Sequence, residues 1–336
     1  MKRWPVSSIR NKGGLLAVLV SLAALAALLS ICLGAVSVPP GKVFAVLSGQ
    51  MAGTPEAQII LFARLPRTCG CLLAGMALAV SGAVIQGVLN NPLAAPNIIG
   101  VNAGAGLAVA LCSALFPAAP GPLAAFLGAL SGVLLVLFIA EKTGAARITL
   151  VLAGVAVSSM FSAGIDAVLT FVPDALNGYS DFRIGGLENL SMNRLAPAFW
   201  VIAAALAAVL ALSGELDILM LGTETAQSLG LPAKPLRLAL LALAAALAGA
   251  AVSFCGLLGF VGLIVPHIMR RLAGEESLWL LLSCAFGGAS LLTFCDLLAR
   301  ILFAPYELPV GIVLSLAGGP FFIWLLLRQR GGRTRD

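Results

Sequence analysis

Charged residues are scarce in this sequence of 336 residues. Asp, Glu, Lys and Arg make up only 10% of the chain, and apolar residues make up 60%. In soluble domains about 25% of the residues are charged and about 45–50% are apolar. From Thr68 to Ala140 no acidic or basic residue occurs. One bilayer crossing needs only about 20 apolar residues, so this stretch has room for about three crossings. The lack of charge therefore excludes an ordinary soluble fold.

Residues that carry catalytic or metal chemistry are also rare. The sequence has one histidine, His267, and no Gly-x4-Gly-Lys-Ser/Thr pattern, which would cradle phosphates. No group of acidic residues, or of Cys and His, has metal-ligand spacing. We therefore expect no catalytic residues, no metal site and no cofactor, so the chain is predicted not to be an enzyme. If ATP drives its activity, a separate chain must bind the nucleotide.

The cysteines and the basic residues do not suggest further chemistry. Cys69 and Cys71 flank one residue, which is not a zinc or redox spacing. The net charge is +6, but the basic residues form no dense patch, which argues against nucleic acid as a partner. The cysteines lie almost entirely in apolar runs, where they usually behave as small apolar side chains: Cys32, Cys69, Cys71, Cys112, Cys255, Cys284 and Cys295.

Long apolar runs are abundant and predict an all-α membrane protein with one transmembrane domain over residues 1–336. The first run follows several basic residues but is too long for the apolar part of a typical signal peptide, so we interpret it as a span. Residues 256–268 are short for a full crossing. About ten spans are expected, at 14–36, 66–89, 95–116, 120–140, 148–171, 196–213, 236–254, 256–268, 278–298 and 308–327.

The basic residues between the runs predict the orientation. With a cytoplasmic N-terminus, 14 of the 20 Lys and Arg residues fall on the cytoplasmic side and 6 outside, as the positive-inside rule requires. Both termini are therefore expected in the cytoplasm. The residues expected outside are Lys42, Arg64, Arg67, Arg183, Arg194 and Arg300.

Two polar segments separate the runs. Residues 171–195 fall outside the membrane, and 214–237 fall on the cytoplasmic side with amphipathic spacing. Thr223 can cap a short helix in this second segment. The segment is either a docking surface for a soluble partner or a helix lying on the membrane.

Small residues and a few charges stand out within the spans. The many Ala, Gly and Ser residues predict close helix packing, and residues 74–92 align weakly with 248–266 as an internal repeat. Asp166, in the outer part of its span, faces either a water-filled pathway or a polar partner near the interface. Asp296 and Arg300 are four residues apart and can pair on one helix face.

Several long motifs together resemble the FecCD family of permeases, over roughly residues 60 to 327. The chain has R-L-P-R-T at 64–68, AGMALAVSGAVIQGVLNNPLAAPNIIGVNAGAG at 74–106 and LMLGTETAQSLGL at 219–231. GFVGLIVPHIMRRLAG follows at 259–274, D-x-x-A-R at 296–300 and ELPVGIVLSLAGGPFFIWLL at 307–326.

The resemblance implies the fold of a type II ABC importer permease, with ten spans in each subunit of a homodimer. It implies a prokaryotic cytoplasmic membrane, two ABC ATPase subunits below and a substrate-binding protein outside. The implied cargo is a metal chelate, by default a ferric siderophore and otherwise haem or cobalamin. The implied mechanism is alternating access, with no covalent chemistry on this chain.

The resemblance also implies roles for particular residues. A loop that couples to the ATPase matches Gly222, Thr223, Glu224, Ala226, Leu229 and Gly230. In the family, arginines at the outer mouth dock the binding protein, and they correspond to Arg64, Arg67 and Arg300. The family's turn near the cytoplasmic gate corresponds to Asn91, Pro92 and Leu93. A second gate element is implied around 142–147. His267 and Arg270 fit the family's P-H-x-x-R at a cytoplasmic helix end.

The chain departs from the family after the fifth span. The family's usual W-x-x-G-S element reads FRIGGLENL at 182–190, with Arg183 in place of Trp and Gly186 in place of Ser. Since this segment should line the outer pathway together with Asp166, we hypothesise that Arg183 contacts an anionic chelate. Arg183 can equally be an exposed loop residue.

Two other functions are open on the sequence. A secondary carrier would work alone on an ion gradient and would not need residues 219–231. A membrane scaffold would transport nothing.

Overall fold

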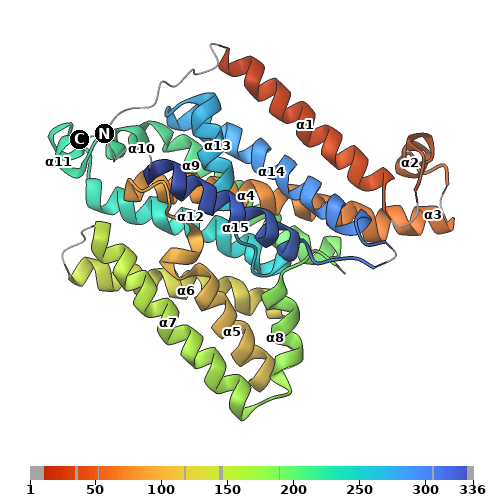
Figure 1. Cartoon of the computed structure of the whole chain (residues 1–336), viewed down its shortest axis with the longest axis horizontal. Coiled ribbons are helices and arrows are strands. Elements are labelled where there is room, and N and C mark those ends of the chain that lie inside the picture. Colours follow the sequence, from red (N-terminus) through yellow and green to blue (C-terminus); the bar gives the residue numbers. More distant parts are fainter. Residues whose placement is uncertain are drawn as a thin grey trace.

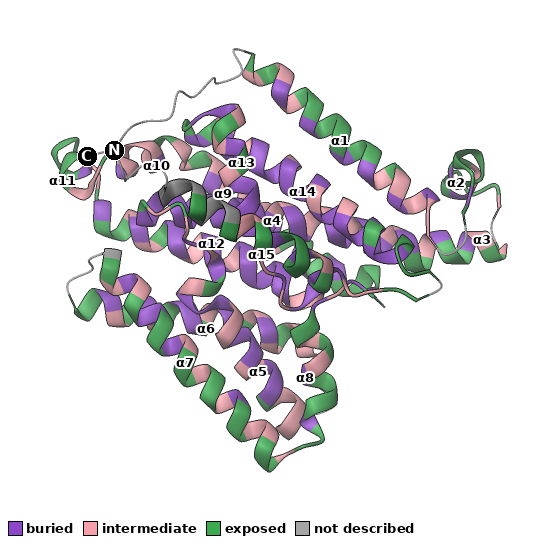
Figure 2. Ribbon diagram, viewed as in Figure 1, coloured by how far each residue is buried: buried purple, intermediate pink, exposed green. Residues whose placement is uncertain are grey.

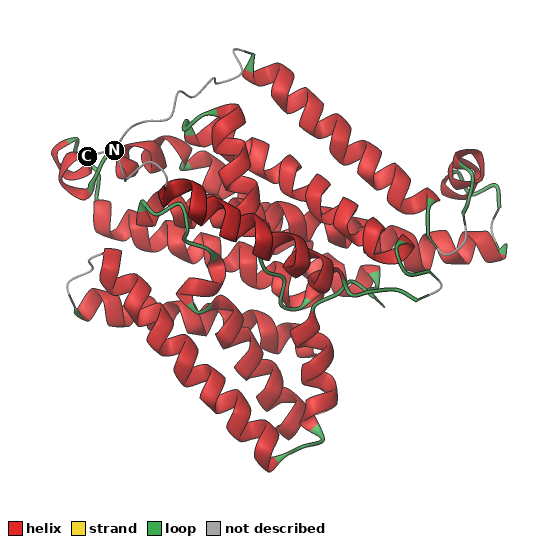
Figure 3. Ribbon diagram, viewed as in Figure 1, coloured by secondary structure: helices red, strands yellow, loops and turns green. Residues whose placement is uncertain are grey.

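The computed structural model describes residues 11–34, 37–51, 53–116, 119–143, 147–188, 190–304 and 306–330. Over these ranges the chain consists of helices joined by loops, without a strand (Figures 1 and 3). The prediction of an all-α protein is confirmed.

Each predicted span corresponds to a helix. Within the described ranges, seven helical stretches are long and apolar enough to cross a membrane, and two more apolar helices, Val101–Leu115 and Val310–Ile323, are shorter. Helix α13 has only 13 residues, in line with the short run expected at 256–268. The corresponding helices are α1 (Lys12–Cys32), α4 (Leu65–Leu89), α5 (Val101–Leu115), α6 (Gly121–Lys142), α7 (Arg147–Phe171), α9 (Met192–Ala211), α12 (Ala233–Cys255), α13 (Val261–Ala273), α14 (Ser277–Ile301) and α15 (Val310–Arg330).

Some predicted boundaries are wrong. Helix α1 ends at Cys32 because Leu33 is extended, with ψ 150°. The second span starts at Pro55 rather than 66, since α3 (Pro55–Gln58) and the π-helical turn η1 (Ile59–Arg64) run directly into α4. A proline in the first turn of a helix needs no backbone N–H there, so Pro66 does not interrupt this run. The third span is broken at Gly100, whose φ of +89° separates the turn η2 (Pro96–Ile99) from α5.

Four short helices lie outside the spans. Helix α2 (Pro40–Leu47) follows α1, and α8 (Ala175–Ile184) forms part of the polar segment 171–195. Helices α10 (Ser213–Met220) and α11 (Thr223–Ser228) occupy the polar segment 214–237. Both segments predicted to lie outside the spans are therefore partly helical.

Helix α4 forms the centre of the bundle, where it packs against α14, α12, α13 and α9. In its most apolar window 83% of the residues are buried, compared with 28% for α7 (Figure 2). Glycines allow this close approach: a Cβ at Gly75 would lie 2.2 Å from the carbonyl oxygen of Gly288, and one at Gly82 would lie 1.9 Å from that of Gly262. The predicted close packing through small residues is confirmed.

Replacing Gly82 by alanine should destabilise the protein. The added methyl group would meet a backbone oxygen of α13, which cannot turn aside like a flexible side chain, so α4 and α13 must separate. We expect a loss of about 1–3 kcal/mol, measured as a lower melting temperature in detergent. The matched control is Gly319→Ala in α15, where a Cβ would meet nothing within 4 Å. Equal melting temperatures for the two variants would contradict the packing argument.

Candidate functional site

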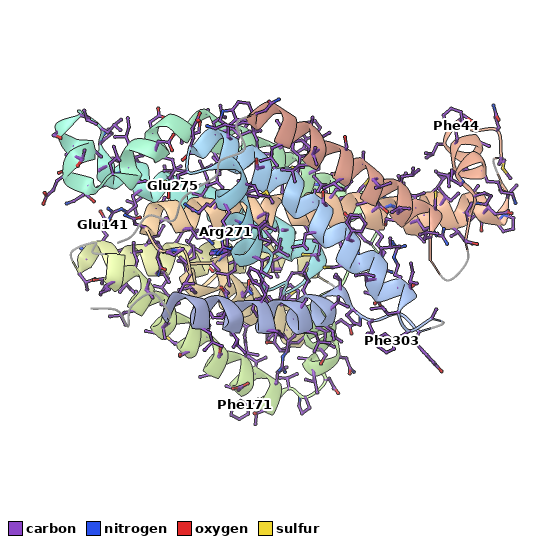
Figure 4. All side chains as sticks on the ribbon, turned by 45° about the horizontal axis from the view of Figure 1, so that its top comes forward. Phe44, Glu141, Phe171, Arg271, Glu275 and Phe303 are labelled. Carbon is purple, nitrogen blue, oxygen red and sulfur yellow. The ribbon has the colours of Figure 1, made fainter. Side chains whose placement is uncertain are left out.

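The predicted functional residues lie at two ends of the bundle. Helices α10 and α11 lie at one end, and α2 and α3 lie at the other (Figure 1). Figure 4 shows Glu141 toward the first end, and Phe44 and Phe303 toward the second. After the roles and sides predicted for them, the two ends are called the coupling end and the outer end.

At the coupling end, α11 is a compact turn between two glycines. Gly222 has φ +125° and Gly230 φ +83°, backbone conformations that side-chain-bearing residues rarely adopt. Ala226 is fully buried. Its amide donates to the carbonyl of Gly222 at 3.0 Å, and its carbonyl accepts from the amide of Leu231 at 3.0 Å. The small residues of the predicted coupling loop therefore fix its shape.

The other residues of this loop are exposed or fastened to α12. Glu224 is exposed, as are the apolar side chains of Leu221 and Leu229, at 69% and 62%. The predicted cap by Thr223 is wrong, because Gly222 occupies the N-cap position without a side-chain bond. The hydroxyl of Thr223 instead accepts a hydrogen bond from Nη2 of Arg237 on α12 at 2.7 Å. Helix α11 is thereby bonded to a long membrane helix.

The predicted gate residues lie beside this segment. Helix α4 ends at Asn90 in the left-handed conformation, and Nδ2 of Asn90 donates to the carbonyl of Met220 in α10 at 3.5 Å. Oδ1 of Asn91 accepts from the amide of Leu93 at 3.0 Å, which forms a turn around the exposed Pro92. The predicted gate residues therefore lie next to α10, which precedes the predicted coupling loop. Of the second gate element, 144–146 lie outside the described residues.

The residues of the P-H-x-x-R motif lie on α13. His267 is within 3.0 Å of Nη2 of Arg271, and its ring packs edge-on against Phe321 of α15. Nη2 of Arg270 donates to the carbonyl of Ala83 on α4 at 3.5 Å. Both residues therefore make contacts between helices.

At the outer end, Asp296 is the centre of a buried ion network. It is 0% exposed, and its carboxylate oxygens accept from Nε of Arg67 at 3.0 and 3.1 Å. Nε of Arg300 lies 3.1 Å from Oδ2 of Asp296, which confirms the pairing expected one helical turn apart. Nη1 of Arg67 donates to Glu307 at 2.5 Å. The network joins α4, α14 and the segment that precedes α15.

The three arginines predicted to meet a binding protein are not exposed. Arg64, Arg67 and Arg300 are only 6%, 8% and 3% exposed, so their side chains are occupied by contacts inside this chain. Arg64 donates to the carbonyls of Ile31 and Cys32, and Arg300 donates to the carbonyl and hydroxyl of Ser30. These contacts hold the end of α1 because a buried guanidinium must satisfy its donors. A docking role stays a prediction.

Asp166 lies on α7 and Arg183 on α8. Asp166 is exposed and lines an open surface pocket of about 510 Å³, whereas Arg183 is exposed in the last turn of α8 and does not line it. Burial raises the pKa of the Tyr179 phenol on α8, while Arg183 lowers it and Asp166 raises it. Sequence reasoning missed Tyr179, as well as Ser158, Ser159 and Ser162, which line the cavity with Asp166. The serine spacing on one helix face could have indicated them.

The segment with the family departure is held against two other spans. The amide of Gly186 donates to the carbonyl of Cys255 at 3.0 Å, and the amide of Leu257 donates to that of Phe182 at 3.0 Å. The amide of Gly311 donates to the carbonyl of Gly185 at 3.3 Å. The loop after α8 therefore contacts the C-terminal end of α12 and the N-terminal end of α15. Asn189 lies outside the described residues.

The described residues form no cluster of metal ligands. No three His, Cys, Asp or Glu residues there come together as metal ligands. The cysteines described are all free. The long apolar helices define a polytopic membrane protein, with a short helix bound to α12 at one end and a surface pocket beside α7.

Comparison with known proteins identifies the family. The sequence profile of the FecCD transport family matches residues 22–328, and the chain belongs to that family. A solved structure described as an inward-facing conformation of a metal-chelate type ABC transporter superposes with a TM-score of 0.82 and 28% identity. The superposition covers 94% of this chain and 99% of the other.

Curated relatives are permeases of iron and haem import. The chain is 40% identical to the hemin transport system permease protein HmuU of Yersinia pestis, over 81% of this chain and 84% of the relative. It is 37% identical to the Fe(3+) dicitrate transport system permease protein FecD of Escherichia coli, over 90% and 95%. It is 36% identical to the iron(3+)-hydroxamate import system permease protein FhuB of Bacillus subtilis, over 93% and 82%.

Proposed function

We propose that this chain is the membrane-spanning subunit of an ABC importer that carries a metal chelate, by default a ferric siderophore, into the cell. The observation that supports this most directly is the family match over residues 22–328, together with relatives that import haem and ferric chelates. Haem and cobalamin are the other cargoes to be tested.

The coupling end supports an ATPase partner. Leu221 and Leu229 present apolar surface on a short helix outside the spans, and exposed apolar groups on a polar segment are typical of an interface. The bond between Thr223 and Arg237 links that helix to α12. Two ABC ATPase subunits that bind here would move α11 and, through α12 and the adjacent end of α4, the gate at Asn91, Pro92 and Leu93.

The remaining assembly follows from the same proposal. A second copy of the chain completes the pathway, an external binding protein delivers the chelate at the outer end, and both termini face the cytoplasm of a prokaryotic cell. Arg67 is the docking arginine of greatest interest, because its second partner, Glu307, is partly exposed. An acidic side chain of the binding protein could exchange with Glu307 there.

Purification and reconstitution test the proposal. The tagged chain, extracted gently from its native membrane, should carry an ATPase that mass spectrometry identifies. In liposomes with this ATPase and the binding protein, radioiron-labelled chelate should accumulate only when ATP is supplied. Chelate uptake by the chain alone on an ion gradient would establish a secondary carrier instead. No cargo movement under either condition would indicate a scaffold.

A further inference from the structure

Helix α14 receives its N-terminal cap from another helix. Its own N-cap residue, Glu276, makes no side-chain bond to the helix, and the first turn contains no acidic residue. The Glu276 carboxylate instead pairs with Lys12 at the start of α1. The first amides of a helix have no partner within the helix. They therefore need an acceptor from elsewhere in the protein.

Asp217 of α10 supplies such an acceptor. Its Oδ1 atom accepts a hydrogen bond from the amide of Ser277, the first residue of α14, at 2.9 Å. The carboxylate also faces the positive end of the helix dipole. Ser277 is 1% exposed, and a bond to an ionised group is stronger where water is scarce. Asp217 therefore bonds α10 to a membrane helix 60 positions further along the chain.

Helix α10 is packed too tightly to move independently of its neighbours. Leu216 and Leu219 are 2% and 1% exposed, and α10 packs against both α4 and α14. Helix α11 follows almost at once, and the amide of Gly222 between them donates to the carbonyl of Leu219 at 3.2 Å. Because close-packed groups transmit displacement, a shift of α11 reaches α10 and then α14. Helices α10 and α11 together are called the coupling segment.

Helices α1 and α14 form a pair that is joined at both ends. They lie side by side (Figures 1 and 4), and the Lys12–Glu276 pair joins them at the coupling end. At the outer end, Nη2 of Arg300 donates to the hydroxyl of Ser30 at 2.6 Å. Helix α14 has 25 residues, about 37 Å, which exceeds the hydrocarbon core of about 30 Å. A shift at its start therefore reaches the network around Asp296.

We propose that Asp217 is a positioning residue that connects the coupling segment to the α1–α14 pair, so that movement driven by the ATPase reaches the outer end. This route is separate from the bond between Thr223 and Arg237, which leads to α12. The inference rests on the proposed import function and names a residue through which ATP hydrolysis drives transport. Without the Asp217 bond, the ATPase still binds and hydrolyses ATP, but less chelate is imported for each ATP.

The amount of chelate imported for each ATP hydrolysed tests this role. The full chain, the ATPase and the binding protein are assembled in liposomes with ferric trihydroxamate, ferric dicitrate or haem, whichever the unmodified importer accumulates. Asp217→Ala should hydrolyse ATP at nearly the unmodified rate. Its uptake for each ATP should fall roughly fivefold, the lower end of the usual coupling between two sites.

Two control variants accompany Asp217→Ala. Asp217→Asn keeps an acceptor oxygen in the same place, and asparagine caps helices about as well as aspartate, so it should restore most of the uptake for each ATP. Glu215→Ala removes a carboxylate from the same helix that makes no hydrogen bond or ion pair with the described residues. It should leave uptake unchanged.

Ser277→Pro removes the same bond from the other helix. Proline has no N–H and is favoured at the first position of a helix, which Ser277 occupies. Glu276 before it has ψ 119°, the extended conformation that a following proline requires. Ser277→Pro should therefore lower uptake for each ATP as Asp217→Ala does, and the double variant should be no worse than either alone. Ser277→Ala keeps the amide and should transport normally.

The outcomes separate this inference from the proposed function. Unchanged uptake for each ATP in Asp217→Ala or in Ser277→Pro would overturn the inference and leave the importer intact. Equal losses in Asp217→Asn and Asp217→Ala, or loss of the bound ATPase, would also overturn it. If Asp217→Ala did not fold, Ser277→Pro would decide alone. No ATP-dependent uptake by the unmodified assembly would refute the proposed function, and this inference with it.

Discussion

Among single substitutions at the outer end, Asp296→Asn should destabilise the protein most. We expect it to lower the free energy of unfolding by about 3–5 kcal/mol. The carboxylate is 0% exposed and lies within 3.1 Å of both Arg67 and Arg300. Asparagine has nearly the same shape but no charge, so the buried Arg67 would keep only Glu307 as an ion-pair partner, and the buried Arg300 would lose its ion pair with Asp296. We expect a low folded yield and a much lower melting temperature in detergent.

An exposed ion pair at the same end provides the control. Lys42 and Glu56 lie 3.0 Å apart, with side chains 48% and 35% exposed, and exposed pairs contribute about 0–1 kcal/mol. Glu56→Gln removes the same charge and should melt nearly like the unmodified chain. A double variant, Asp296→Asn with Arg300→Met, should recover part of the stability because it removes one uncompensated charge.

Two outcomes would contradict this account. If Asp296→Asn melted like Glu56→Gln, the network would contribute little and burial of Asp296 would need another reason. If the double variant were less stable than Asp296→Asn alone, the contacts between Arg300 and Ser30 would matter more than charge balance.

The number and order of the spans could be predicted because each apolar run is long and bounded by charge, proline or glycine. The outer network could be predicted only in part. Asp296 and Arg300 are neighbours on one helix, but Arg67 reaches Asp296 from 229 positions away. Such a contact depends on how α4 packs against α14, which no local pattern contains. For this reason the burial of Arg64, Arg67 and Arg300 could not be predicted from the sequence.

The proposed internal repeat shows that similar sequence patterns can adopt different backbone structures. Residues 74–92 and 248–266 have similar patterns of small residues, yet 74–89 belong to one continuous helix and 256–260 interrupt the helices α12 and α13. Gly82 lies mid-helix against Gly262, while Gly256 has φ +71°. A glycine can serve either close packing or an unusual backbone angle, and the sequence alone does not distinguish the two uses.

Changing Leu229 to aspartate should abolish recovery of the ATPase partner without unfolding the chain. The Leu229 side chain is 62% exposed and follows the last turn of α11, so its loss removes few internal contacts. In the assembled importer the same carboxylate would be buried against a partner without a matching charge. A loss of at least about 1.4 kcal/mol in binding corresponds to tenfold less recovered complex. Quantitative mass spectrometry of the purified complex and ATP-dependent uptake measure this.

Leu176→Asp in α8 provides the matched control, since this leucine is also exposed, at 48%, but α8 lies away from α10 and α11 (Figure 1). It should retain the ATPase. Arg237→Met tests the next link, because it leaves the surface of α11 intact but removes the bond to Thr223. We expect this variant to bind the ATPase normally but to transport the chelate poorly. If Leu229→Asp kept both the ATPase and full uptake, α11 would not be the coupling surface. The importer proposal would then need a different contact between this chain and the ATPase.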